Sequence, residues 1–284
     1  MRIIRDPGRL NRLLKGPRYC SKSIGFVPTM GALHPGHLSL IKHARRDNDT
    51  VVVSIFINPA QFGPREDLNK YPRPLKNDLA LCRKARVDLV FLPDSEIMYP
   101  EGFCTFVHVE KLANILCGAT RPGHFRGVTT VVAKLLHIVA PSVLYLGQKD
   151  AQQAVIIKRM ISDLNFPVKV KVMPTVREKS GLAASSRNAY LSEQERKDAL
   201  VLFRALNLAK VLIRGGAKDT VRIISRLKQL INKHKNVKID YIAVVDSMHL
   251  KPLKRVTGNC LVALAVYIGK TRLIDNCLIT LPSS

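Results

Sequence analysis

Two histidines three residues apart are the residues of this 284-residue chain whose types and spacing most plainly suggest chemistry. His34 and His37 enclose Pro35 and Gly36. Imidazoles at positions i and i+3 lie on nearly the same side of a helical turn, so both can face one ligand. Proline suits a first turn, whose free N–H groups and positive dipole end favour an anion. The pattern predicts a polyphosphate site at the start of a helix.

Two other interpretations of His34 and His37 stay open at this point. The imidazoles could simply cap a helix at the protein surface. A metal site is less well supported, because two histidines need further ligands and no adjacent cysteine or carboxylate completes a set.

The residues on either side of the histidines predict the elements that position them. Residues 24–27 have the β-branched and aromatic content of a buried strand, and apolar residues recur at helical spacing after His37. Gly31 and Gly36 allow the backbone between them to approach a ligand where a Cβ would clash. We expect a strand that runs through a tight turn into a helix.

Strands and helices then alternate as far as about residue 175. Strands are expected at residues 51–57, 88–92, 104–109, 143–146 and 168–172, with helices at 74–84, 128–139 and 150–164. The alternating pattern of residues 104–109 suggests an edge strand. Alternating elements imply βαβ crossovers, so residues 1–175 are predicted to form an α/β, Rossmann-like domain with a mostly parallel sheet.

The pattern changes in residues 176–284. Ser192 and Glu195 match a capping box that begins a helix ending near residue 213, before Gly215 and Gly216. A second helix is expected at 220–234, and strands at 239–245, 261–268 and 271–281. Helices followed by an antiparallel meander predict a smaller α+β domain that covers the site.

Polar residues follow two of the expected strands. Gln61 lies in the loop after strand 51–57, and open α/β sheets bind ligands at this end of a strand. An ordinary loop amide is an equal alternative. Lys149 follows strand 143–146 in a Gly-Gln-Lys-Asp sequence that would direct a lysine at phosphates. Asp150 and Gln153 also match a capping box, and both roles can hold together.

Two further segments could bind an anion. Arg121, His124 and Arg126 lie in a glycine-bounded loop before helix 128–139, although a basic loop is unremarkable on so basic a protein. Residues 178–188 combine small side chains and hydroxyls with Arg187, which describes a mobile loop able to enclose a polyphosphate. A plain flexible linker is the alternative.

The composition limits the classes of protein and partner. Lys and Arg number 46 against 21 Asp and Glu, a formal net charge of +25. The basic residues are scattered, the chain has no Trp, and no stripe of aromatics alternates with cations, so we expect no nucleic-acid partner. No apolar run could span a bilayer and no signal peptide is evident, so we expect a cytoplasmic protein without a membrane partner. The six cysteines form no Cys-x-x-Cys pair and are expected to be reduced.

Five motifs then carry a resemblance to a known family. The His-x-Gly-His turn alone resembles the nucleotidyltransferase superfamily that includes class I aminoacyl-tRNA synthetases. In order and spacing, the whole set resembles the pantoate–β-alanine ligase family. The motifs are residues 28–37 (PTMGALHPGH), 58–62 (NPAQF), 121–125 (RPGHF), 147–153 (GQKDAQQ) and 181–188 (GLAASSRN).

The resemblance implies an ATP-dependent condensation of (R)-pantoate with β-alanine through an enzyme-bound pantoyl adenylate. Pyrophosphate and then AMP are released, Mg²⁺ is bound mainly through the ATP phosphates, and the enzyme is a homodimer. An adenylate-forming attack builds negative charge on phosphoryl oxygens, which positioned cations and donors stabilise. The rival activity is a nucleotidyltransferase that releases its adenylylated product.

The resemblance also implies roles for individual residues. His37 is the expected proton donor, with His34, Lys149 and Arg187 as further catalytic residues. Gln61 and Gln153 are expected to bind pantoate, and Gln61 also borders the β-alanine position. The expected ATP-binding residues are Met30, Gly31, Ala32, Leu33, His34, Pro35, Gly36, His37, Gly147, Gln148, Lys149, Asp150, Val176, Ala184, Ser185, Ser186 and Arg187. Ser180 and Ala184 replace the Asp and Met that are usual in the family, and Ala184 is expected to loosen the packing of adenine.

Overall fold

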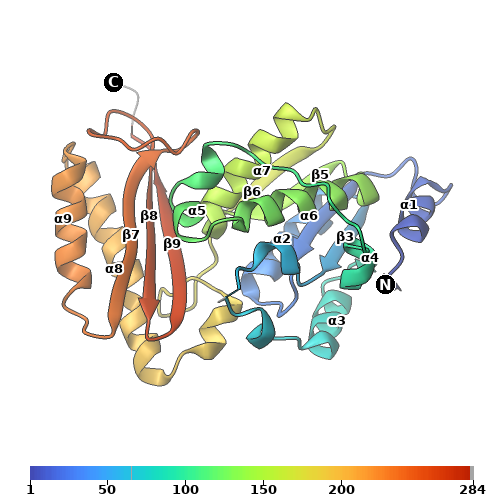
Figure 1. Cartoon of the computed structure of the whole chain (residues 1–284), viewed down its shortest axis with the longest axis horizontal. Coiled ribbons are helices and arrows are strands. Elements are labelled where there is room, and N and C mark those ends of the chain that lie inside the picture. Colours follow the sequence, from blue (N-terminus) through green and yellow to red (C-terminus); the bar gives the residue numbers. More distant parts are fainter. Residues whose placement is uncertain (65, 282–284) are drawn as a thin grey trace. The chain divides into compact units, whose positions relative to one another are not determined.

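The computed structural model describes residues 1–64 and 66–281, and the chain divides into two compact units (Figure 1). The first unit comprises Met1–Gln148 with Gln153–Pro174, and the second comprises Lys149–Gln152 with Thr175–Ser284. The expected boundary after residue 175 and the observed one after Pro174 differ by one residue. Lys149–Gln152, expected in the first domain, instead group with the second unit.

A six-stranded parallel sheet forms the centre of the first unit, with the strand order β1-β4-β3-β2-β5-β6. Its strands are β1 (Arg2–Ile4), β2 (Ile24–Thr29), β3 (Thr50–Ile55), β4 (Leu89–Phe91), β5 (Val143–Gly147) and β6 (Lys169–Met173). Every residue of β3 is buried, as a parallel strand covered on both faces requires. The predicted Rossmann-like parallel sheet is confirmed, and only the three-residue β1 was missed.

Helices connect these strands, and those at residues 7–15, 95–98 and 117–120 were not predicted. They are α1 (Pro7–Lys15), α2 (Pro35–Asp47), α3 (Leu75–Lys84), α4 (Ser95–Met98), α5 (Cys117–Thr120), α6 (His124–Val139) and α7 (Ala151–Asp163), with 3₁₀ turns η1 (Pro59–Gln61), η2 (Leu68–Lys70), η3 (Leu112–Asn114) and η4 (Gln148–Asp150). Ile41 and Ala44 of α2 and Cys82 of α3 pack with Val27 and Val53 in one apolar core. This packing fixes the start of α2 relative to the end of β2.

Residues 104–109 are not a strand, so the predicted edge strand is wrong. The backbone of Val107 bonds to hydroxyl groups of α6 instead of to a neighbouring strand. Its N–H donates to Thr130 Oγ1 at 3.0 Å, and Thr129 Oγ1 donates to its carbonyl at 2.6 Å. Because the threonine side chains satisfy this backbone, the alternating sequence needs no sheet partner. The structure also begins α6 at His124, four residues before the predicted start.

The second unit packs helices against a three-stranded antiparallel sheet of order β7-β8-β9 (Figure 1). Its elements are η5 (Ser186–Tyr190), α8 (Glu193–Arg214), α9 (Thr220–Ile231), β7 (Val237–Asp246), β8 (Cys260–Ile268) and β9 (Thr271–Ile279). The predicted capping box is confirmed, with Glu195 N–H donating to Ser192 Oγ and Ser192 N–H donating to Glu195 Oε2. The predicted α+β character of this region is confirmed.

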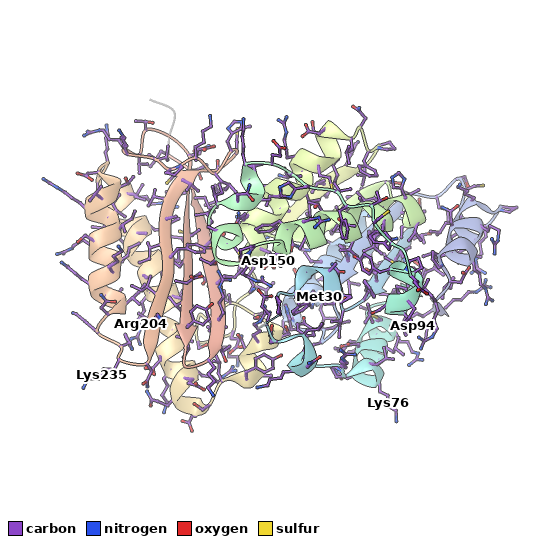
Figure 2. All side chains as sticks on the ribbon, viewed as in Figure 1. Met30, Lys76, Asp94, Asp150, Arg204 and Lys235 are labelled. Carbon is purple, nitrogen blue, oxygen red and sulfur yellow. The ribbon has the colours of Figure 1, made fainter. Side chains whose placement is uncertain are left out.

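Basic side chains are dispersed over the surface of each unit. Lys76 lies exposed on α3, and Arg204 and Lys235 lie exposed in the second unit (Figure 2). Within residues 1–64 and 66–281, none of the helices has both the length and the apolar content that a membrane crossing requires. The six cysteines are all free thiols, four of them buried, as the sequence predicted.

Candidate active site

The turn between β2 and α2 places both histidines of the His-x-Gly-His sequence at the start of a helix. His34 is the N-cap residue of α2, and its Nδ1 accepts a hydrogen bond from the Gly36 N–H at 3.2 Å. The proton of a neutral His34 therefore lies on Nε2. The His34 and His37 rings have centroids 4.0 Å apart and planes 31° apart. The strand-turn-helix prediction is confirmed, and both imidazoles share one side of the turn.

The backbone before His34 adopts a left-handed conformation. Gly31 has φ +82° and Ala32 has φ +49°, a region that costs a residue with a Cβ about 1–2 kcal/mol. Thr29 Oγ1 accepts from the Gly31 N–H at 3.1 Å and donates to the Ser54 carbonyl at 2.7 Å. Hydrogen bonds from outside the turn thus hold the conformation that precedes the histidines.

Asp78 of α3 supplies the other part of this support. Its Oδ2 accepts from the Ala32 N–H at 2.9 Å, and its Oδ1 accepts from the Leu33 N–H at 2.8 Å. The residue is only 1% exposed, and burial raises its pKa above 3.8 although the two N–H groups oppose that effect. A buried carboxylate therefore fixes two successive peptide groups of the turn.

The sequence prediction missed Asp78, which lies 46 residues from Ala32. One signal was present, because Asp78 occupies the apolar face of α3 together with the buried Cys82 four residues later. A carboxylate on the buried face of a helix must have partners. Sequence alone did not indicate that those partners are backbone N–H groups of the turn.

The turn lies where the strand order of the sheet reverses. β2 pairs with β3 over all six of its residues, up to Thr29 opposite Ile55. It pairs with β5 at Gly25 and Phe26, near the amino ends of both strands. The carboxyl ends of β2 and β5 therefore lack ladder bonds to each other, and open α/β sheets bind ligands at such a switch point.

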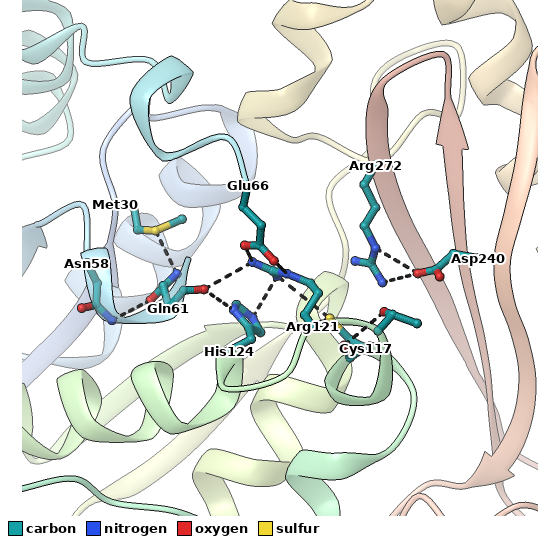
Figure 3. A network of polar contacts seen from close by, with 10 residues as sticks. Met30, Asn58, Gln61, Glu66, Cys117, Arg121, His124, Asp240 and Arg272 are labelled. Carbon is teal, nitrogen blue, oxygen red and sulfur yellow. Dashed lines mark hydrogen bonds and ion pairs between the residues drawn. The ribbon is translucent and has the colours of Figure 1, made fainter. Parts of the chain in front are cut away.

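Gln61 is brought next to the turn, as Figure 3 shows. Its Nε2 lies 3.0 Å from Met30 Sδ, and its Oε1 accepts from Asn58 Nδ2 at 3.0 Å. Asn58 is 1% exposed, and its Oδ1 accepts from the Tyr99 hydroxyl at 2.7 Å. Because a thioether is a weak acceptor, the Gln61 N–H groups keep most of their capacity to donate to a ligand.

Arg121 and His124, which the sequence offered as anion-binding residues, bind groups of the chain itself (Figure 3). Arg121 pairs with both oxygens of Glu66, at 2.7 Å and 2.5 Å, and its side chain is 12% exposed. His124 Nδ1 donates to the Gln61 carbonyl at 2.8 Å. Arg126 lies over the Phe106 ring, 3.7 Å from its centroid. Arg121 therefore holds Glu66, and His124 holds the backbone of Gln61.

Residues 60–64 line a cavity of about 220 Å³ in the first unit. Its walls include Gln61 and Phe62 on one side and the beginning of α6 on the other, with Phe106, His124 and Arg126 among them. Burial alone would raise the pKa of Glu66, but its bonds to Arg121 outweigh that effect and the pKa is lowered from 4.5. The ion pair thus stays charged beside this cavity.

Residues 175–188 of the second unit, where the sequence predicts a mobile loop, form a turn with several buried and hydrogen-bonded residues. Leu182, Ala183 and Ala184 are buried, and the Ala184 N–H donates to the Val176 carbonyl at 2.9 Å. Asn188 Nδ2 donates to Glu178 Oε1 at 2.9 Å and to the Ala183 carbonyl at 3.0 Å. These bonds give the small side chains a structural role. Ser185 caps η5 by accepting from the Arg187 N–H at 3.3 Å.

Lys149 and Asp150 also belong to the second unit. Lys149 Nζ lies 3.6 Å from Asp150 Oδ1, and the Lys149 carbonyl accepts from Asn276 Nδ2 at 2.8 Å. Gln153 lies in the first turn of α7 and belongs to the first unit. Across the described ranges, no group of three or more His, Cys, Asp or Glu side chains is arranged to hold a metal ion.

Comparisons with known proteins agree on one family. A sequence model of the family described as pantoate-beta-alanine ligase matches residues 2–278. A pantothenate synthetase of Fervidobacterium nodosum is 52% identical over 279 residues, covering 98% of this chain and 99% of that protein. One from Heliobacterium modesticaldum is 55% identical over 258 residues, covering 91% of this chain and 92% of that protein.

Solved structures give the same result. The pantothenate synthetase of Thermus thermophilus has a TM-score of 0.93 at 46% identity, over 98% of this chain and 99% of that one. The pantoate-beta-alanine ligase of Francisella tularensis, complexed with beta-gamma ATP and beta-alanine, has a TM-score of 0.81 at 37% identity. That match covers 98% of this chain and 97% of that one.

Proposed function

This chain belongs to the pantoate–β-alanine ligase family, and from that premise we propose how its residues carry out the ligation. The enzyme joins pantoate to β-alanine at the expense of ATP, through a pantoyl adenylate, and releases pyrophosphate and AMP. The observation that supports the residue roles best is the paired imidazoles at the start of α2, directly after the switch point of the sheet.

In the first step a carboxylate oxygen of pantoate attacks the α-phosphorus of ATP, and the bond to pyrophosphate breaks. Negative charge grows on the phosphoryl oxygens and on the departing group. His37 is proposed as the proton donor, and His34, whose proton lies on Nε2, as a second donor to the phosphates. The positive end of the α2 dipole adds to this stabilisation.

In the second step the amine of β-alanine attacks the acyl carbon of the adenylate. The new amide bond forms as the bond to AMP breaks, and the amine gives up a proton. Gln61 and Gln153 are proposed to bind pantoate, and Gln61 to border the β-alanine position. The contact of Gln61 with Met30 supports this role, because it sets the amide beside the turn.

The remaining ATP contacts are proposals that come from the family resemblance. Lys149 and Arg187 are expected to bind phosphates, and the other residues named for ATP above keep their expected roles. Mg²⁺ is proposed to be held mainly through ATP phosphate oxygens, since this cation usually combines few carboxylates with substrate phosphates. We further propose that the enzyme acts as a cytoplasmic homodimer.

Steady-state and single-turnover assays test these roles. Pantothenate and AMP should form only when pantoate, β-alanine and ATP are all present. His37→Ala should slow adenylate formation by about 10²-fold, the effect of removing one charge-stabilising donor. Gln153→Ala should raise the KM for pantoate far more than the KM for ATP. Lys149→Ala should raise the KM for ATP far more than the KM for pantoate.

Other results would contradict the proposal. Equal effects of Gln153→Ala on both KM values would mean that the assignment of residues to pantoate and ATP is wrong. A stable adenylylated product released in the presence of β-alanine would favour the nucleotidyltransferase instead. A His37→Ala variant with normal turnover would remove the proton-donor role.

A further inference from the structure

Two adjacent polar residues lie in the middle of β9, the edge strand of the second unit's sheet. Asp275 is 3% exposed and Asn276 is 6% exposed. Buried polar groups are costly unless they are hydrogen-bonded. Asp275 and Asn276 therefore need hydrogen-bond partners inside the protein.

The two side chains leave opposite faces of the strand, because successive strand residues alternate. Asp275 shares the face of Leu273 and Cys277, both members of the core formed with α8 and α9. Asn276 shares the other face with Leu278, which is 49% exposed. One dipeptide can thus bind two different segments of the chain.

Asp275 binds the beginning of the 177–188 segment. Its Oδ2 accepts from Arg177 Nη1 at 2.6 Å and its Oδ1 accepts from Arg177 Nη2 at 3.0 Å. Arg177 Nη1 also donates to the Gly181 carbonyl at 3.0 Å, and its guanidinium lies 5.0 Å from the Phe203 ring centroid. This ion pair fixes the turn that leads to Arg187.

Asn276 binds the backbone of Lys149. Its Nδ2 donates to the Lys149 carbonyl at 2.8 Å, so it holds the peptide group directly beside the Lys149 Cα. The lysine ammonium lies at the end of a flexible four-carbon stem. A fixed backbone therefore restricts the positions that the ammonium can reach. The Asn276 N–H in turn donates to Asp275 Oδ1 at 2.8 Å, which joins the two contacts.

We propose that Asn276 is a positioning residue for the ligase reaction, which acts by fixing Lys149 while its neighbour Asp275 fixes the segment that carries Arg187. The inference rests on the proposed role of Lys149 in binding ATP. Asn276 touches no substrate in this scheme. Asn276 affects the rate of the reaction through the position of Lys149. Replacing Asn276 should therefore have no further effect once Lys149 has been removed.

A double-mutant cycle tests this coupling. Asn276→Ala, Lys149→Ala and the double variant are mixed with ATP and pantoate without β-alanine, and the rate of adenylate formation is measured in a single turnover. Leu278→Ala is the matched control, because it removes an exposed side chain from the same face of β9. Thermal unfolding of each variant shows that the rates refer to folded protein.

The expected rates differ sharply between the variants. Lys149→Ala should be about 10²-fold slower than the unmodified enzyme, and Asn276→Ala about 10-fold slower, because misplacing a charge-stabilising group costs less than removing it. The double variant should be no slower than Lys149→Ala alone. Leu278→Ala should react at the normal rate.

Each other result would overturn a defined part of the scheme. A double variant slowed by the product of the two single effects, or a normal rate for Asn276→Ala, would overturn the inference alone. A normal rate for Lys149→Ala would overturn the proposed role of Lys149 and the inference with it. If Asn276→Ala does not fold, Asn276→Ser takes its place, and failure of both to fold would overturn the inference by making Asn276 a residue of the core.

Discussion

Replacing Asp78 by Asn should weaken ATP binding and stability together, although the two side chains are nearly equal in size. The carboxylate accepts two backbone N–H groups, one on each oxygen. An asparagine keeps one acceptor and turns an NH₂ group towards the other N–H, which is then left unsatisfied. Losing one buried hydrogen bond of this kind costs about 1–3 kcal/mol.

Two further effects act on the Asp78→Asn variant in opposite directions. Burial raises the pKa of Asp78, so removing the charge relieves part of the cost of burying it. The left-handed conformation of Ala32 lowers the free energy of unfolding of the variant. This conformation costs about 1–2 kcal/mol, and the turn that holds it has lost part of its hydrogen bonding. We expect a net loss of about 2 kcal/mol in the free energy of unfolding.

The same loss should appear in the kinetics. If ATP must restore the turn on binding, about 2 kcal/mol corresponds to a rise of roughly 30-fold in the KM for ATP. The KM for pantoate should change much less. Denaturant unfolding and initial-rate assays measure both quantities, and Asn77→Asp on the exposed neighbouring position is the control. An Asp78→Asn variant with unchanged stability and an unchanged KM for ATP would refute the reasoning.

Three other predictions concern stability and reactivity. The folded-state pKa of Glu66 is lowered from 4.5, so its stabilising ion pair is complete above that value and is lost as pH falls through the lowered pKa. Between about pH 7 and about pH 3, the free energy of unfolding should therefore fall less for Glu66→Gln than for the unmodified enzyme, as measured by denaturant unfolding. Gly181→Ala should destabilise the protein by about 1–3 kcal/mol or more, since its φ is +100° and a Cβ would lie 2.4 Å from the Phe203 ring; an unchanged Tm would contradict this. An alkylating reagent should modify two of the six thiols in the folded protein, and mass spectrometry should locate them at Cys20 and Cys104.

The strand-turn-helix around His34 and His37 was predictable because all its determinants are local. Proline in the first helical turn, glycine before it and the helical spacing after it lie within a few residues of one another. The capping box at Ser192 was predictable for the same reason. Local signals of this kind need no knowledge of tertiary contacts.

The errors arose where distant contacts decided the structure. Residues 104–109 look like a strand, but hydroxyl groups of α6 satisfy the backbone there. Residues 182–184 are buried and hydrogen-bonded, and sequence alone did not indicate these contacts. For Arg121 the sequence left the anionic partner open, and the structure pairs it with the carboxylate of Glu66 in the same chain. Asp78 gave no local sign of its backbone partners.

The assignment of Lys149–Gln152 to the second unit has a consequence for dividing this protein. The chain passes between the units after Gln148, after Gln152 and again after Pro174, which makes three passages where the sequence suggested one. A fragment that begins at Thr175 would therefore leave out four residues of its own unit, including the acceptor of the Asn276 hydrogen bond. We expect such a fragment to be less stable than its apolar core suggests, and a truncation at residue 175 to give two incomplete pieces. For protein engineering, the second unit is not a detachable module.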